Sequence, residues 1–217
     1  MSPRTLFFIA IAVSMSFTVA AGAYFSKAEL HPKCLKVVPT PALSTEWGLK
    51  LFAGARFYIP FGSNTAIHHI SELLTGAKIS TPKDLKDWCA NVRIKGFKLV
   101  MDGHDGQYIV QDCAVVKKGI NDCTVNPNSE NPRKQKEGNG IFTIVWTDNE
   151  SSMAIVRCTS DGLYNDWYVF SSEPSLNETT KGEILNSMNK LGFSDTIDDA
   201  ISLSYEGCKL FDPEEED

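Results

Sequence analysis

The clearest pattern in the chain is a set of three short apolar runs between residues 141 and 173. The runs are Ile141–Trp146, Met153–Val156 and Trp167–Phe170, and each is rich in β-branched and aromatic residues. Polar, turn-forming clusters at 147–149 and 160–162 separate them. Runs of this length and composition suit a pleated, half-buried surface rather than a helix. The stretch therefore predicts three consecutive antiparallel strands.

Similar patterns predict further strands on both sides of this stretch. They lie at Gly54–Ile59, Trp88–Ile94, Phe97–Met101 and Gln107–Val116, with a last one in which Ile201, Leu203 and Tyr205 alternate with polar residues. Gly119–Asp122 is predicted as a turn after the fourth of these. About eight or nine short strands joined by tight turns are typical of an up-and-down antiparallel barrel.

Two segments have helical rather than strand spacing. Thr65–Gly76 carries an apolar stripe and interrupts the strands, so it reads as a helical insertion after the first strand. Together with the Thr81-Pro82 start signal, this insertion could cover the mouth of a ligand site. Asn177–Leu191 is amphipathic and has Gly192 at the C-cap position. Trp47–Phe52 could form one helical turn. The predicted fold class is all-β, an eight-stranded barrel with a C-terminal helix and this insertion.

The first 23 residues have the pattern of a secretory signal peptide. Arg4 precedes the apolar run Leu6–Ala12, and Ala21-Gly22-Ala23 has the small-x-small form of a cleavage site. A signal anchor is the alternative. Residues 24–217 are then expected to form a single secreted, extracellular domain that ends in an acidic tail at 212–217.

All six cysteines follow the signal segment, and an even count in an exported chain indicates disulfides. The shortest closure is a hairpin bond between Cys113 and Cys123. No Cys-x-x-Cys occurs, and the adjacent His68 and His69 would diverge by about 100° on a helix, so no metal site is expected. Asn149 and Asn177 begin glycosylation sequons.

Charge and motifs exclude several classes of function. The net charge is −6, and no basic stripe of the kind that binds nucleic acid is present. No run long and apolar enough to span a bilayer follows the signal segment. Gly-x-Ser-x-Gly is absent and histidine is scarce, so we expect the chain not to be an enzyme.

Three segments resemble the motifs of the lipocalins, in particular the insect bilin-binding and apolipoprotein-D-like branch. Val145–Asn149 with Cys158 looks like the second motif, in which Thr147 and Asp148 form the turn. Trp167–Ser172 looks like the third motif, and Gly54-x-x-Phe57-Tyr58 sits where the first motif belongs. The resemblance spans roughly Pro32 to Cys208.

The resemblance implies three disulfides and also shows two departures. The implied pairs are Cys34–Cys158, Cys89–Cys208 and Cys113–Cys123. Arg56 stands where the family has a tryptophan in the first motif, and Ser172 stands where it has an arginine in the third. In the family these two side chains pack together at the closed end of the barrel. We therefore expect a rebuilt barrel floor.

An eight-stranded barrel can hold one small ligand, and alternate residues of each strand face it. If Cys158 faces outward, Met153, Ile155 and Arg157 face inward. The same alternation, counted from residues 56 and 172, places Tyr58, Tyr168 and Phe170 inside. Arg157 could bind the carboxylate of a bilin or fatty acid, or it could meet solvent or an acidic side chain at the rim.

The expected function is that of a secreted carrier for a small hydrophobic ligand, such as a bilin pigment, retinoid or fatty acid. No cofactor is required, although a bilin could be bound. The alternative is an interaction or inhibitor protein that uses loops such as Thr65–Lys83 on a filled barrel. A homo-oligomer or a cell-surface receptor stays open as a partner.

Overall fold

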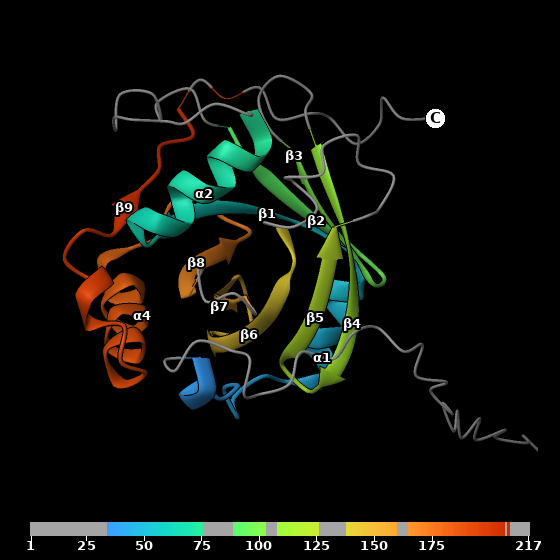
Figure 1. Ribbon diagram of the computed structural model, residues 1–217, viewed down its shortest axis with the longest axis horizontal. Helices are drawn as coiled ribbons and strands as arrows, with labels where there is room; N and C mark the ends of the chain where they lie inside the picture. Colours follow the sequence, from blue (N-terminus) through green and yellow to red (C-terminus); the bar gives the residue numbers. More distant parts are fainter. Residues whose placement is uncertain are drawn as a thin grey trace, which may run out of the picture.

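A closed barrel of eight antiparallel strands forms the body of the molecule (Figure 1). The computed structural model describes residues 34–75, 89–102, 108–125, 138–159, 165–206 and 208. The strands are β1 (Ala53–Gly62), β2 (Asn91–Lys95), β3 (Lys98–Asp102), β4 (Tyr108–Lys117), β5 (Ile120–Val125), β6 (Gly140–Thr147), β7 (Ser152–Cys158) and β8 (Asn165–Ser171). Each pairs with the next, and β1 closes the barrel by pairing with both β2 and β8. This up-and-down closure is the lipocalin architecture, so the predicted fold class is confirmed.

The closing strand β1 is irregular at both of its seams. Its register shifts between Ala53 and Arg56 against β2, and between Tyr58 and Phe61 against β8. Gly62 suits the close second seam, because an added Cβ would lie 3.0 Å from the Tyr168 Cβ and 3.1 Å from the Trp167 carbonyl oxygen, which is tighter than most Cβ contacts. A short strand, β9 (Ile201–Ser202), pairs with the far end of β1.

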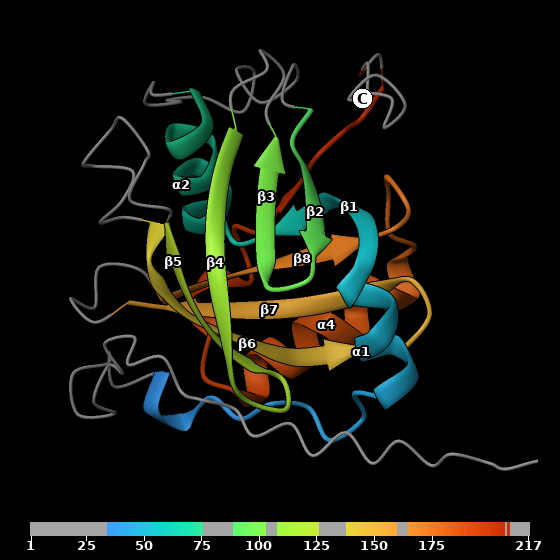
Figure 2. The same cartoon turned by 90° about the vertical axis from the view of Figure 1, so that its right-hand side faces the viewer.

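Helices lie at both ends of the barrel and on its outside. They are α1 (Thr45–Phe52), α2 (Asn64–Thr75) and α4 (Glu178–Lys190), with the short 3-10 turns η2 (Cys34–Lys36) and η3 (Ser194–Thr196). Figure 2 shows α2 near one end of β3 and β4, and α1 beside the other end, where the β2–β3 turn lies. Within the described ranges, no helix is long and apolar enough to cross a membrane.

Strand alternation divides the apolar residues of β7 and β8 between two cores. Met153, Ile155, Tyr168 and Phe170 belong to the cluster inside the barrel. Their neighbours on the opposite face pack outside, against Ile184, Met188 and Phe193 from α4 and the segment after it. The helix starts where the Asn177 side chain accepts a hydrogen bond from the Thr180 backbone N–H. It ends at Lys190 with Leu191 as its C-cap, and Gly192, whose φ is +86°, follows that cap.

Three disulfides join Cys34 to Cys158, Cys89 to Cys208 and Cys113 to Cys123. These are the pairs that the resemblance implies. The first ties the N-terminal segment to β7, and the third links β4 to β5 within their hairpin. The two long closures span 124 and 119 residues and, in the chain-entropy picture, each stabilises the fold by about 3–5 kcal/mol.

Several predicted strand ends are shifted by one to three residues, and two predicted boundaries are wrong for reasons that the structure shows. The predicted turn at Gly119–Asp122 is too long, because Gly119 has a φ of +76° and lets the chain reverse at once, so that β5 begins at Ile120. The last predicted strand pairs with β1 only through Ile201 and Ser202, although Leu203 still donates a backbone hydrogen bond to Pro60. The signal-peptide segment, Thr81-Pro82 and the acidic tail lie outside the described residues.

The β6–β7 turn is organised around the Asp148 carboxylate. One of its oxygens, Oδ1, accepts hydrogen bonds from the backbone N–H groups of Glu150, Ser151 and Ser152, each at 2.9 Å. Thr147 Oγ1 donates to the Ser152 carbonyl and accepts from the Asn149 N–H. Burial raises the pKa of Asp148, but the hydrogen bonds from Ser152, Glu150 and Ser151 outweigh it, so the pKa lies below its usual value.

We expect Asp148→Ala to destabilise the fold by about 1–2 kcal/mol at neutral pH, the lower range for hydrogen bonds to a charged group, since the carboxylate is partly exposed. Because its folded pKa is lowered, this stabilisation is present above the unfolded pKa and is lost as the pH falls through the folded pKa. Chemical denaturation of wild type and variant across the acid range measures the difference. Glu150→Gln in the same turn is the control, and a pH-independent difference for Asp148→Ala would contradict the account.

Candidate functional site

The barrel contains a cavity of about 310 Å³ that opens at the α1 end. Its inner wall consists of apolar side chains from four strands, β3, β6, β7 and β8: Leu99, Phe142, Ile144, Met153, Ile155 and Phe170. Residues of α1, the β2–β3 turn and the β4–β5 turn surround the mouth, among them Leu49, Phe97 and Val115. The polar side chains that line the cavity are Ser44, Thr45, Lys98, Lys118 and Asn121. The lining is thus mostly apolar.

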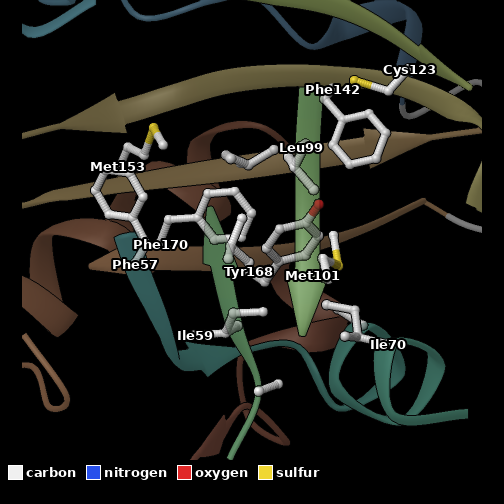
Figure 3. Close-up of a cluster of buried hydrophobic side chains, with 14 of the residues drawn as sticks. Phe57, Ile59, Ile70, Leu99, Met101, Cys123, Phe142, Met153, Tyr168 and Phe170 are labelled. Atoms are coloured by element: carbon white, nitrogen blue, oxygen red, sulfur yellow. The ribbon is translucent and has the colours of Figure 1, made fainter. Parts of the chain in front are cut away.

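The opposite end of the barrel is filled by α2. Ile67, Ile70, Leu73 and Leu74 are buried in the same cluster as the barrel interior. In Figure 3 the Ile70 side chain reaches from α2 toward Met101 and Tyr168. Because α2 packs into this end, the predicted role for the insertion needs correction: it covers a barrel end, but the cavity opens at the other one.

An aromatic cluster packs α1 against the barrel interior. Phe57 stacks on Phe170 with ring centroids 6.2 Å apart, and Trp47 meets Phe57 edge-on at 6.1 Å (Figure 3 shows the first pair). The prediction that Arg56 faces the interior is wrong, because the β1 irregularity turns Phe57 inward and leaves Arg56 opposite Arg93 on the other face. Ser172 is exposed and donates its backbone N–H to the Ser151 carbonyl.

Three of the predicted inward residues line the cavity, namely Met153, Ile155 and Phe170. Tyr168 also faces inward but lies deeper, toward α2. The inward orientation predicted for Tyr58 is wrong, since it shares the face of Arg56. There its ring packs edge-on against Tyr205 at 4.8 Å, while the Tyr205 hydroxyl donates to the Ala90 carbonyl.

Arg157 faces the interior, as predicted, but its guanidinium binds Asp166. Nη2 lies 3.0 Å from Oδ2, and Nε donates to Oδ1 at 3.3 Å, with both side chains no more than 4% exposed. The two residues are direct cross-strand partners on β7 and β8. Burial raises the pKa of Asp166, and the charge and hydrogen bonds of Arg157 oppose that rise. Of the partners expected for Arg157, namely a ligand carboxylate, solvent or an acidic side chain, the structure shows an acidic side chain, that of Asp166.

Two further polar groups lie in the deep part of the barrel. Within the described residues, the Tyr168 hydroxyl and Gln111 Oε1 have no hydrogen-bond partner. Both residues, with Arg157, border a void of about 10 Å³, which is close to the space that one water molecule needs. Burial raises the pKa of Tyr168, so this hydroxyl stays protonated.

Sequence reasoning missed the residues that form the mouth. Gly48 lies inside α1, lines the cavity, and would place a Cβ in open space with no atom within 4 Å. Leu49 and Phe97 flank the opening. Gly48 within a short predicted helical turn was an available sequence signal, because glycine is unfavourable in the interior of a helix.

The two sequon asparagines have different surroundings. Asn149 donates its side-chain amide to the Ala42 carbonyl and accepts from the Ser44 N–H, so a glycan on its nitrogen would leave one N–H for the first bond. Asn177 is exposed and uses only its side-chain oxygen, as the cap of α4. Glycosylation itself stays a prediction at both sites.

We expect Arg157→Met to destabilise the fold by about 3–5 kcal/mol, because it leaves the Asp166 carboxylate buried without its partner. Arg157→Met/Asp166→Leu should recover part of that loss, which a double-mutant cycle by chemical denaturation measures. The affinity of the double variant for a fatty acid should match that of wild type. If the double variant instead bound the fatty acid tenfold or more weakly than wild type, Arg157 would contribute to ligand binding.

Comparisons with known proteins give structural likenesses only. No protein-family model matches the chain, and no curated protein matches it either. It is similar to the tryptamine complex of the amine binding protein of Rhodnius prolixus, at 11% identity, 82% and 90% coverage of the two chains and a TM-score of 0.48. It is also similar to an LTBP1 complex with LTC4, at 14% identity, 80% and 99% coverage of the two chains and a TM-score of 0.47. A third similar structure is insecticyanin from the tobacco hornworm Manduca sexta, at 15% identity, 80% and 88% coverage of the two chains and a TM-score of 0.45. Likenesses at this level leave the ligand to be inferred from the cavity itself.

Proposed function

We propose that this protein is a carrier that holds a small hydrophobic ligand in the barrel cavity. The observation that carries the proposal is the cavity of about 310 Å³ with its almost continuous apolar wall. Ligand sites are typically apolar cavities with a few polar groups that set orientation. A filled barrel would have favoured the alternative, an interaction or inhibitor protein. The cavity therefore favours the carrier over that alternative.

The size of the cavity favours a compact ligand. Its volume lies at the lower end of the range of about 300–1,000 Å³ for ligand pockets. A fatty acid or a retinoid suits such a space better than a tetrapyrrole with its propionates. Among the expected ligand classes, we therefore place the single apolar chain or ring ahead of the bilins.

The placement of the polar groups gives the ligand a direction. Lys98 and Lys118 line the cavity from the two turns at its mouth, whereas Phe142, Ile155 and Phe170 line its interior. The buried cation, Arg157, already binds Asp166. A ligand with an apolar body and a carboxylate would place the body inside and the carboxylate near the lysines, because an ammonium group stabilises an anion most where water is partly excluded.

The three disulfides support an exported carrier, since such bonds persist in oxidising compartments. A carrier of this kind has no catalytic step. The two long closures also stabilise a barrel that does not fill its own interior, because an empty apolar cavity removes packing contacts from its lining.

Gly48→Phe should reduce fatty-acid affinity by about tenfold or more, equivalent to about 1.4 kcal/mol, because the new ring fills the cavity from the α1 side. Titration with a fluorescent fatty acid, with retinol and biliverdin as further probes, measures the change. Gly182→Phe is the matched control, since Gly182 is also inside a helix with no atom within 4 Å of an added Cβ, but lies on α4.

Circular dichroism and thermal unfolding should show that both variants fold. If wild type binds none of the three probes, the carrier proposal fails. If both phenylalanine variants bind the fatty acid as wild type does, the ligand does not occupy this cavity.

A further inference from the structure

Exposed apolar side chains gather around the mouth of the cavity. Six large hydrophobic residues are exposed in the described part of the chain, and four of them lie on the three elements at this end. Leu49 of α1 is 66% exposed, Phe97 of the β2–β3 turn is 55% exposed, and Val115 and Val116 of β4 are 46% and 41% exposed. Exposed apolar groups that cluster in one place, rather than scatter, mark an interaction surface.

Lysines lie beside the apolar residues of the two hairpin turns. Lys95 and Lys98 flank Phe97, and Lys117 and Lys118 follow Val116; all four are exposed. The same elements carry two exposed carboxylates, Glu46 of α1 and Asp112 of β4, the latter opposite Lys98. This end therefore has two more lysines than carboxylates, although the whole chain has a net charge of −6. The excess of positive charge therefore lies at the same end of the barrel as the exposed apolar residues.

We propose that this end of the barrel docks on the surface of an anionic phospholipid bilayer. Apolar tips that enter the boundary between headgroups and acyl chains, with lysines at headgroup level, are the combination that holds a peripheral protein on such a surface. The occupant is an anionic lipid surface because the apolar residues alone would suit many partners, whereas the four lysines on the two hairpin turns favour negative charge opposite them.

A second copy of the chain suits this face less well. A twofold interface places the same patch on both subunits, so the four lysines of one copy would face those of the other. Like charges brought together in this way oppose association. The charge pattern therefore favours the bilayer over a dimer.

Docking would place the cavity mouth against the bilayer. Leu49, Phe97 and Val115 both line the mouth and are exposed, so the apolar wall is continuous from the cavity to the surface. A hydrophobic ligand could then pass between membrane and cavity without entering water. This transfer rests on the proposed carrier function, whereas the docking itself does not.

Co-sedimentation with phosphatidylcholine vesicles, with and without phosphatidylserine, tests the proposal. We expect wild type to bind the anionic vesicles and to be released as salt rises from about 0.1 M to about 0.5 M. The variant Lys95→Gln/Val116→Ser/Lys117→Gln should bind at least about tenfold more weakly, because it removes two cations and one apolar tip. None of these three residues lines the cavity, so fatty-acid binding in solution should be unchanged.

The matched control is Val38→Ser/Lys181→Gln/Lys190→Gln, which makes the same chemical changes on the N-terminal segment and on α4. It should bind vesicles as wild type does. Equal loss in both triple variants, or no binding of wild type to anionic vesicles, would overturn the proposal. So would gel filtration that shows a wild-type dimer which Lys95→Gln/Val116→Ser/Lys117→Gln dissociates. Gly48→Phe should still dock, so failure of ligand binding and failure of docking are separate results.

Discussion

The packing of α2 into one end of the barrel determines where the molecule can hold a ligand. A barrel of eight strands encloses enough space for side chains or for one small molecule, but not for both along its whole length. The stripe Ile67, Ile70, Leu73 and Leu74 occupies the end nearest α2. At the other end α1 covers the interior only in part, and the glycine at position 48 leaves space where other residues would place a side chain. The cavity lies where the barrel is not filled by its own chain.

Between the two ends, the interior contains a polar layer. Arg157 and Asp166 form a buried ion pair, and the Tyr168 hydroxyl and Gln111 amide lie beside it. Such a pair contributes little net stability, because desolvation of the two charges offsets most of their attraction, but removal of either partner is costly. Its consequence for function is clear. Arg157 pairs with a carboxylate of the protein itself, so in the proposed carrier the cations left for a ligand are Lys98 and Lys118 at the mouth.

The sequence predicted the inward residues of β7 and β8 and failed on those of β1. Because the side-chain period of a strand is two, placing Cys158 outward was enough to place Met153, Ile155 and Arg157 inside. In β1 the register shifts, so Phe57 faces inward where residue 56 was expected. The partner of Arg157 could not be predicted either, since it depends on the register between β7 and β8. The mouth of the cavity was missed because its walls come from α1 and two hairpin turns that only tertiary packing brings together.

A crystal structure of the protein with a bound long-chain fatty acid would test the central claim most directly. The account predicts density for the acyl chain along Phe142, Ile155 and Phe170, with the carboxylate at the mouth near Lys98 and Lys118 and with α2 still packed in the opposite end. Density for the acyl chain among Ile70, Leu73 and Tyr168, with α2 displaced from the barrel, would contradict it.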